Sequence, residues 1–135
     1  MRYGTSRFFS LRFALLVVAL ALTCAGAACA AVIKADGSDD GKTIHLRKGS
    51  ALQISLEANA STGYGWELQP ASTPLLKLQS HSYINAATNR PGAPGTALFR
   101  FSATGKGAGT LSMQYVRPWE HVSASRVFLL HIVIQ

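Results

Sequence analysis

Apolar and polar residues alternate with a period of two along much of the chain after residue 42. Leu52, Ile54 and Leu56, for example, are separated by polar residues. The same alternation recurs in further short runs, at residues 44–46, 66–68, 76–78, 99–101 and 111–115. Because successive side chains of a β-strand point to opposite faces, each run is typical of a strand with one buried face. The chain is therefore predicted to be all-β.

The last run, residues 126–135, is rich in β-branched and apolar residues on both faces, which predicts a strand that is central in its sheet or covered on both sides. Residues that favour turns separate the runs, at 48–50, 59–65, 70–74, 85–95, 104–109 and 117–125. About seven short strands at this spacing predict an immunoglobulin-like antiparallel β-sandwich over residues 42–135. Residues 31–41 before it, which include the polar segment Asp36–Asp40, are expected to form a flexible lead-in.

The first thirty residues have the three-part pattern of a secretory signal peptide. Basic residues precede the apolar run Phe13–Leu22, and Ala28-Cys29-Ala30 fits the small-x-small cleavage rule. Ten apolar residues span about 15 Å as a helix, too little for a bilayer core of roughly 30 Å. We expect cleavage after Ala30, a periplasmic or secreted location, and no stable membrane insertion afterwards. A permanent anchor is the alternative.

Cleavage after Ala30 would remove both cysteines of the chain, Cys24 and Cys29. Core packing, rather than disulfides, would then hold the domain together. A lipoprotein acylated on Cys24 or Cys29 is a further alternative, although the residues before each cysteine match a lipidation box poorly. The remaining domain has a net charge of about +4 and only short basic runs, which does not favour a nucleic-acid partner.

Three longer loops are expected at the same end of the sandwich, because successive connections between antiparallel neighbours tend to alternate between the two ends. They cover residues 59–65, 85–95 and 117–125 and hold most of the unusual chemistry: glycines, prolines, arginines, a tyrosine and a tryptophan. Loops on one end of a rigid sandwich are where such folds bind their partners. The three loops therefore predict a composite binding surface.

Within these loops, some residues have two possible roles. The hydroxyls of Ser61 and Thr62 can hydrogen-bond their own loop or a partner. Trp66 begins an alternating run, so it is predicted to be a core residue. Pro118 stiffens the base of Trp119, which either projects toward a partner or folds back over the sheet edge or onto Arg117.

Three motifs in these loops carry a family resemblance: Asn59–Tyr64 (NASTGY), Gly92–Gly95 (GAPG) and Arg117–Trp119 (RPW). In this order, on an all-β chain with a signal peptide, they resemble the chagasin-like inhibitors of papain-type cysteine proteases. The first family motif reads Asn-Pro-Thr-Thr-Gly-Tyr/Phe and the second Gly-x-Gly-Gly. This chain departs from them with Ala60, Ser61 and Pro94, and keeps Arg-Pro-Trp intact. The resemblance extends from about residue 44 to residue 135.

The resemblance implies a reversible inhibitor, a monomer, whose three loops occlude the active-site cleft of a papain-like cysteine protease. Ser61 and Thr62 would lie nearest the catalytic Cys–His pair, with the other two loops on either side and no covalent step. The implied protease-binding residues are Asn59, Ala60, Ser61, Thr62, Gly63, Tyr64, Arg90, Pro91, Gly92, Ala93, Pro94, Gly95, Arg117, Pro118 and Trp119. Ala60 would leave its loop less restrained than proline does, and Pro94 lacks a backbone donor.

Two function classes other than inhibition are compatible with an all-β chain of this kind. A secreted binding or adhesion module could use the same loops for another protein or a glycan. An enzyme is not favoured, because no set of residues stands out as a catalytic constellation. The four histidines lack metal-ligand spacing, and the glycine-rich segment 105–109 leads into a strand rather than a phosphate-binding helix. Neither a metal nor a cofactor is therefore expected.

Overall fold

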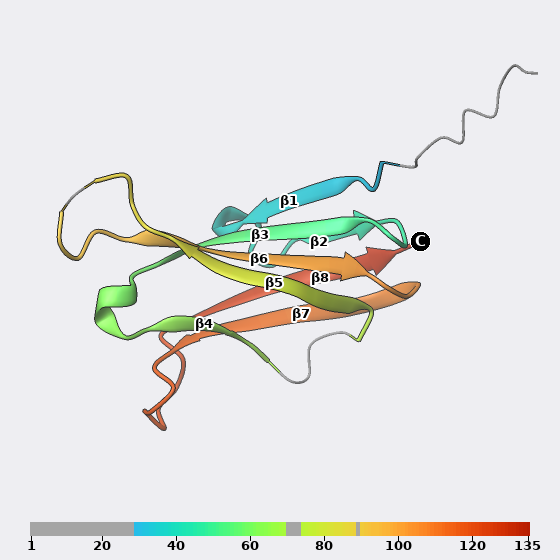
Figure 1. Cartoon of the computed structure of the whole chain (residues 1–135). Helices are drawn as coiled ribbons and strands as arrows, with labels where there is room; N and C mark the ends of the chain where they lie inside the picture. The colour runs from blue at the N-terminus through green and yellow to red at the C-terminus, as the bar shows by residue number, and fades with distance from the viewer. Residues whose placement is uncertain (1–28, 70–73, 89) are drawn as a thin grey trace, which may run out of the picture.

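The computed structural model describes residues 29–69, 74–88 and 90–135, which form a β-sandwich (Figure 1). The described strands are β1 Val32–Asp36, β2 Thr43–Leu46, β3 Ala51–Ala58, β4 Gly65–Leu68, β5 Leu76–Ile84, β6 Gly95–Ala103, β7 Gly107–Val116 and β8 Arg126–Ile134. Two short 3-10 turns, η1 Gly37–Asp39 and η2 Ala60–Thr62, complete the elements. One sheet has the order β1-β3-β6-β5 and the other β2-β8-β7-β4. The predicted all-β sandwich is confirmed, while the expected signal peptide lies almost wholly outside the described residues.

The expected flexible lead-in at residues 31–41 is wrong. Strand β1 pairs in parallel with β3, with Ala35 opposite Ile54 in the register, and Ala35 is buried. Asp36 then caps η1 in a reciprocal capping box with Asp39. In β1 the inward-facing Ile33 and Ala35 alternate with Lys34 and Asp36, but this pattern is too short to distinguish a strand from a loop by itself.

The described part of the chain has eight strands, in line with the expected number of about seven. The sandwich is, however, not wholly antiparallel, since β1–β3 and β2–β8 are parallel pairs. Both pairs arise because the chain crosses from the edge of one sheet to the edge of the other between β1 and β2, so that neither strand is joined to its neighbour by a hairpin.

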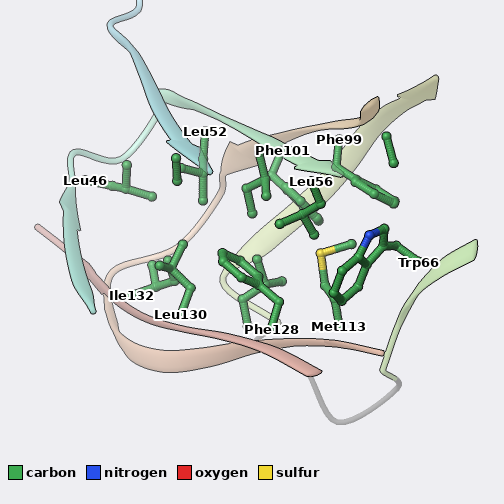
Figure 2. Packing of buried hydrophobic residues seen from close by; sticks show 14 of the residues in the cluster. Leu46, Leu52, Leu56, Trp66, Phe99, Phe101, Met113, Phe128, Leu130 and Ile132 are labelled. Atoms are coloured by element: carbon green, nitrogen blue, oxygen red, sulfur yellow. The ribbon is translucent and has the colours of Figure 1, made fainter. Parts of the chain in front are cut away.

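The core lies between the two sheets, where the alternating apolar residues meet. Leu52, Leu56 and Phe101 of one sheet point toward residues of the facing sheet, among them Leu130 and Met113 (Figure 2). All of these side chains are almost completely buried, and burying each contributes about 1.5–3 kcal/mol to folding. Trp66 belongs to the same cluster, which confirms its predicted place in the core.

Strand β8 is central, as predicted, but only one of its faces is covered. Phe128, Leu130 and Ile132 are buried, whereas Val127 and Leu129 are 47% and 39% exposed. Of the two interpretations of this run, the central strand is the one observed, because a two-layer sandwich buries only the inner face of each sheet.

The β3–β4, β5–β6 and β7–β8 loops all lie at the same end of the sandwich, on the left in Figure 1. The connections β2–β3 and β6–β7 lie at the other end. The predicted grouping of the three longer loops is therefore confirmed, and it places residues from distant parts of the sequence side by side.

Candidate functional site

The β3–β4 loop is a compact turn whose polar groups largely bond to one another. Asn59 caps η2, and its side-chain Oδ1 accepts hydrogen bonds from the Ser61 backbone N–H at 3.1 Å and the Ser61 hydroxyl at 2.6 Å. The Thr62 hydroxyl donates to the Asn59 carbonyl at 2.7 Å. Gly63 ends the turn with a φ of 79°, in the left-handed region that favours glycine. Of the two roles considered for the Ser61 and Thr62 hydroxyls, bonding within their own loop is the one observed.

Two tyrosines of the strands below hold the start of this loop. The Tyr115 hydroxyl accepts a hydrogen bond from the Asn59 N–H at 2.8 Å. The Tyr83 hydroxyl donates to the Ala58 carbonyl at 3.2 Å and accepts from the Ala60 N–H at 3.5 Å. Ala60 thus gains a restraint that a proline could not make, because proline has no N–H. Sequence reasoning missed both tyrosines; the only available signal was a tyrosine on the inward face near a strand end.

The β5–β6 loop is joined to the β3–β4 loop through Asn59. The Asn59 Nδ2 donates to the Gly92 carbonyl at 2.8 Å. Arg90, Pro91, Gly92 and Ala93 form a tight turn closed by a bond from the Ala93 N–H to the Arg90 carbonyl at 3.2 Å. Proline followed by a glycine with a φ of 78° is the pattern of a type II turn.

Two other predicted site residues of the β5–β6 loop have different surroundings. Pro94 is exposed, whereas Gly95 is buried at the start of β6, opposite Ala58. A Cβ at Gly95 would collide with the Ile84 carbonyl and the Tyr83 ring. Gly95 therefore serves the packing beneath the loop rather than its surface.

Arg117 joins the β7–β8 loop to the β3–β4 loop. Its Nε donates to the Thr62 carbonyl at 3.0 Å, and Nη1 donates to the Glu120 carboxylate at 2.8 Å. The guanidinium also lies 4.4 Å from the centroid of the Tyr64 ring, and Tyr64 stacks on Tyr115 at 5.3 Å. The hydrogen bond with Glu120 raises the pKa of Arg117.

Trp119 is 66% exposed, yet its ring lies directly over the backbone of Gly63. A Cβ built on Gly63 would be 2.5 Å from Cη2 of the indole, so only glycine fits beneath the ring. Trp119 thus folds back neither over the sheet edge nor onto Arg117. Its indole rests on a neighbouring loop and keeps most of its surface exposed, while the Arg117 guanidinium lies over the Tyr64 ring.

The three loops therefore form one connected edge, which we call the loop edge (Asn59–Tyr64, Arg90–Gly95 and Arg117–Trp119). Its most exposed residues are Ala60, Ser61, Thr62, Arg90, Pro91, Gly92, Pro94, Pro118 and Trp119. Asn59, Tyr64 and Arg117 are only partly exposed and connect the loops to one another or to the core. Such a surface is preorganised to bind another molecule, because little loop ordering is left to occur on association.

Neither a metal-binding cluster nor a membrane-spanning helix is present in the described ranges, 29–69, 74–88 and 90–135. Their histidines, cysteine and carboxylates form no group of three or more that could hold a metal ion. The same ranges contain no helix long and apolar enough to cross a membrane.

An immunoglobulin-like sandwich whose three loops are joined into one edge is typical of a binding protein. Comparison with protein families identifies the family to which this chain belongs. Residues 45–132 match the model of the chagasin family peptidase inhibitor I42. This match covers more than half of the chain, and the chain belongs to the chagasin family of peptidase inhibitors.

Individual relatives agree with this assignment. Amoebiasin-2 of Entamoeba histolytica is 28% identical over 83 residues, which cover 61% of this chain and 68% of the relative. Amoebiasin-1 of the same organism is 28% identical over 93 residues, or 69% of this chain and 90% of the relative. The crystal structure of the cysteine protease inhibitor EhICP2 from Entamoeba histolytica superposes with a TM-score of 0.67 at 25% identity, covering 77% of this chain and 96% of that one.

Proposed function

We propose that this protein is a reversible inhibitor of papain-like cysteine proteases and that its loop edge occludes the active-site cleft. The observation that carries the proposal is the set of contacts between loops: Asn59 to Gly92, Arg117 to Thr62, and Trp119 over Gly63. These contacts join the motifs that resemble the family into one surface. Membership of a peptidase-inhibitor family and the likeness to EhICP2, a cysteine protease inhibitor, support the same conclusion.

The shape of the β3–β4 loop accounts for inhibition without cleavage. A protease cleft processes an extended peptide, whereas residues Ala60–Thr62 form a 3-10 turn closed by Asn59. The folded turn fills the cleft without offering an extended scissile bond. Binding therefore needs no covalent step, and the inhibitor itself acts without catalysis.

The polarity of this loop indicates how it meets the catalytic pair. The donor groups of Ser61 and Thr62, both N–H and O–H, are already used inside the loop. Their hydroxyl oxygens retain lone pairs, which can accept a hydrogen bond from the catalytic imidazolium. Ser61 and Thr62 would thus act as acceptors toward the protease, with Trp119 as an exposed aromatic anchor on one side.

Beyond the loop edge, we propose that the chain acts as a monomer outside the cytoplasm after removal of residues 1–30. The N-terminal pattern of basic, apolar and small residues supports export. Contacts of the sandwich extend close to the expected cut, since the Ala31 carbonyl accepts a hydrogen bond from the Ala51 N–H at 2.9 Å. N-terminal sequencing of the protein recovered from an expressing cell would test the cleavage site.

Inhibition assays against a panel of papain-like cysteine proteases test the main proposal, with a serine protease as the control. We expect tight inhibition that reverses on dilution and is lost when the catalytic cysteine is first blocked by a bulky thiol reagent. Absence of inhibition of every panel member at high micromolar concentrations would contradict the proposal. Cleavage of the β3–β4 loop during inhibition would contradict the proposed mode of action.

A further inference from the structure

A hollow of about 340 Å³ lies on the loop edge between the β3–β4 and β5–β6 loops. It is lined by Asn59 and Ser61 of the β3–β4 loop, by Tyr83 near the end of β5, and by Asn85, Thr88 and Arg90 of the β5–β6 loop. Alanine and proline side chains of the two loops complete its wall. The hollow thus combines an apolar wall with polar groups, which is the usual character of a site that accepts one side chain of a partner.

Arg90 differs from the other two arginines near this end of the sandwich. Arg117 is paired with Glu120 at 2.8 Å. Arg126 lies over the Tyr115 ring at 4.6 Å and is 3.9 Å from the Glu57 carboxylate. Arg90 is exposed, and no hydrogen bond or ion pair joins its guanidinium to another residue in the part of the chain that the structure describes. Its positive charge is therefore uncompensated at the edge of the hollow.

The backbone that carries Arg90 is restrained. The turn from Arg90 to Ala93 is closed by its own hydrogen bond, and Asn59 holds it through the Gly92 carbonyl. Pro91 removes further freedom from the same turn. A charged group on such a base loses less conformational entropy on pairing than one on a mobile loop.

We propose that this hollow is a specificity subsite that accepts an acidic side chain, Asp or Glu, from the cleft wall of the target protease. The carboxylate pairs with Arg90, and the aliphatic part of the side chain packs on the apolar wall. This inference rests on the proposed inhibitory function and adds to it a preference among proteases. Proteases with an acidic residue at this part of the wall are inhibited best, mainly through faster association, because rim charges act chiefly on the association rate.

The test compares Arg90→Glu with Arg47→Glu, which changes the net charge equally. Arg47 is exposed in the β2–β3 turn, at the end of the sandwich away from the loop edge. Association rates and inhibition constants are measured at low and high salt against an inhibited protease that has an acidic cleft wall. The same measurements are made on variants of that protease in which each wall carboxylate is changed in turn to Lys. Thermal melting of each inhibitor variant confirms its fold.

For Arg90→Glu we expect association at low salt to slow by about tenfold, with a smaller effect at high salt. Arg47→Glu is expected to associate as the wild type does. One of the wall Lys variants should restore rapid association to Arg90→Glu while slowing the wild type. If the wild type inhibits but both charge variants associate equally fast with every protease, the subsite is disproved and the inhibitory function stands. If the wild type inhibits no papain-like protease, both proposals fail.

Discussion

The two ends of the sandwich are held in different ways. At the end away from the loop edge, which we call the plain end, hydrogen bonds between backbone groups extend the two sheets. The Gly49 N–H donates to the Ala103 carbonyl at 2.8 Å, and the Ala103 N–H donates to the Ser50 carbonyl at 2.9 Å. At the loop edge, side chains of Asn59 and Arg117 make the connections between loops instead. The backbone of these loops can therefore project beyond the sheets, while the side-chain hydrogen bonds of Asn59 and Arg117 restrain it.

This difference means that substitutions at the two ends should separate stability from binding. At the plain end, a lost restraint costs folding free energy alone. At the loop edge, the same loss also changes the shape of the surface that meets the protease. Matched pairs of substitutions, one at each place, test this difference directly.

The largest effect on inhibition is expected for Trp119→Ala. Trp119 is 66% exposed in the free protein, and removal of a tryptophan hot spot commonly costs about 2 kcal/mol or more of binding free energy, roughly thirtyfold in affinity. The melting temperature should change little. Val122→Ala is the control, since Val122 is 65% exposed in the same loop. Equal inhibition by the two variants would exclude Trp119 from the interface.

Gly63→Ala should affect both stability and inhibition. Its positive φ makes alanine unfavourable by about 1 kcal/mol, and the added Cβ would displace the Trp119 ring, so inhibition should weaken by about tenfold or more. Gly49→Ala is the matched control, because Gly49 has a φ of 88° and open space around it. It should lose similar stability, measured by urea unfolding, and keep full inhibition. Parallel loss of inhibition in both variants would show that Trp119 does not depend on Gly63.

Tyr115→Phe removes the hydroxyl that accepts the Asn59 N–H. We expect a loss of about 1 kcal/mol in the free energy of unfolding and a several-fold weaker inhibition, since the start of the β3–β4 loop is released. Thr104→Val provides the comparison at the plain end, where the Thr104 hydroxyl donates to the Leu75 carbonyl at 3.1 Å. That variant should be affected in stability alone. Unchanged inhibition by Tyr115→Phe would contradict its positioning role.

The smallest effect is expected for a substitution in η1, Asp39→Ala, which should change only how the melting temperature depends on pH. A hydrogen bond from Ser38 lowers the pKa of Asp36, and one from the Asp36 backbone N–H lowers that of Asp39, both from an ordinary value of 3.8. A lowered folded-state pKa means that the stabilisation is present above the unfolded-state pKa and is lost as the pH falls through the folded-state pKa. Asp39→Ala should therefore flatten the acid limb of the melting temperature below about pH 4. Inhibition at neutral pH should stay unchanged.

Some of this organisation follows from local sequence. The alternation at Leu52, Ile54 and Leu56 is enough to predict a one-sided strand, because the period of two depends only on backbone geometry. The glycines and prolines mark the loops for the same local reason. The order of the three motifs then predicts a shared edge, since connections in such a sandwich alternate ends.

Other features depend on partners distant in the chain, which a local pattern does not contain. Strand β1 exists because the free edge of β3 is available to pair with it, and Val127 is exposed because no third layer covers β8. Asn59 holds the Gly92 carbonyl from 33 residues away, and Trp119 rests on Gly63 from 56 residues away. The sequence by itself determined the strands from β2 onward, the loops and the family. Only the tertiary structure decided which loop residues support the edge and which face a partner, because that choice depends on contacts between segments far apart in the chain.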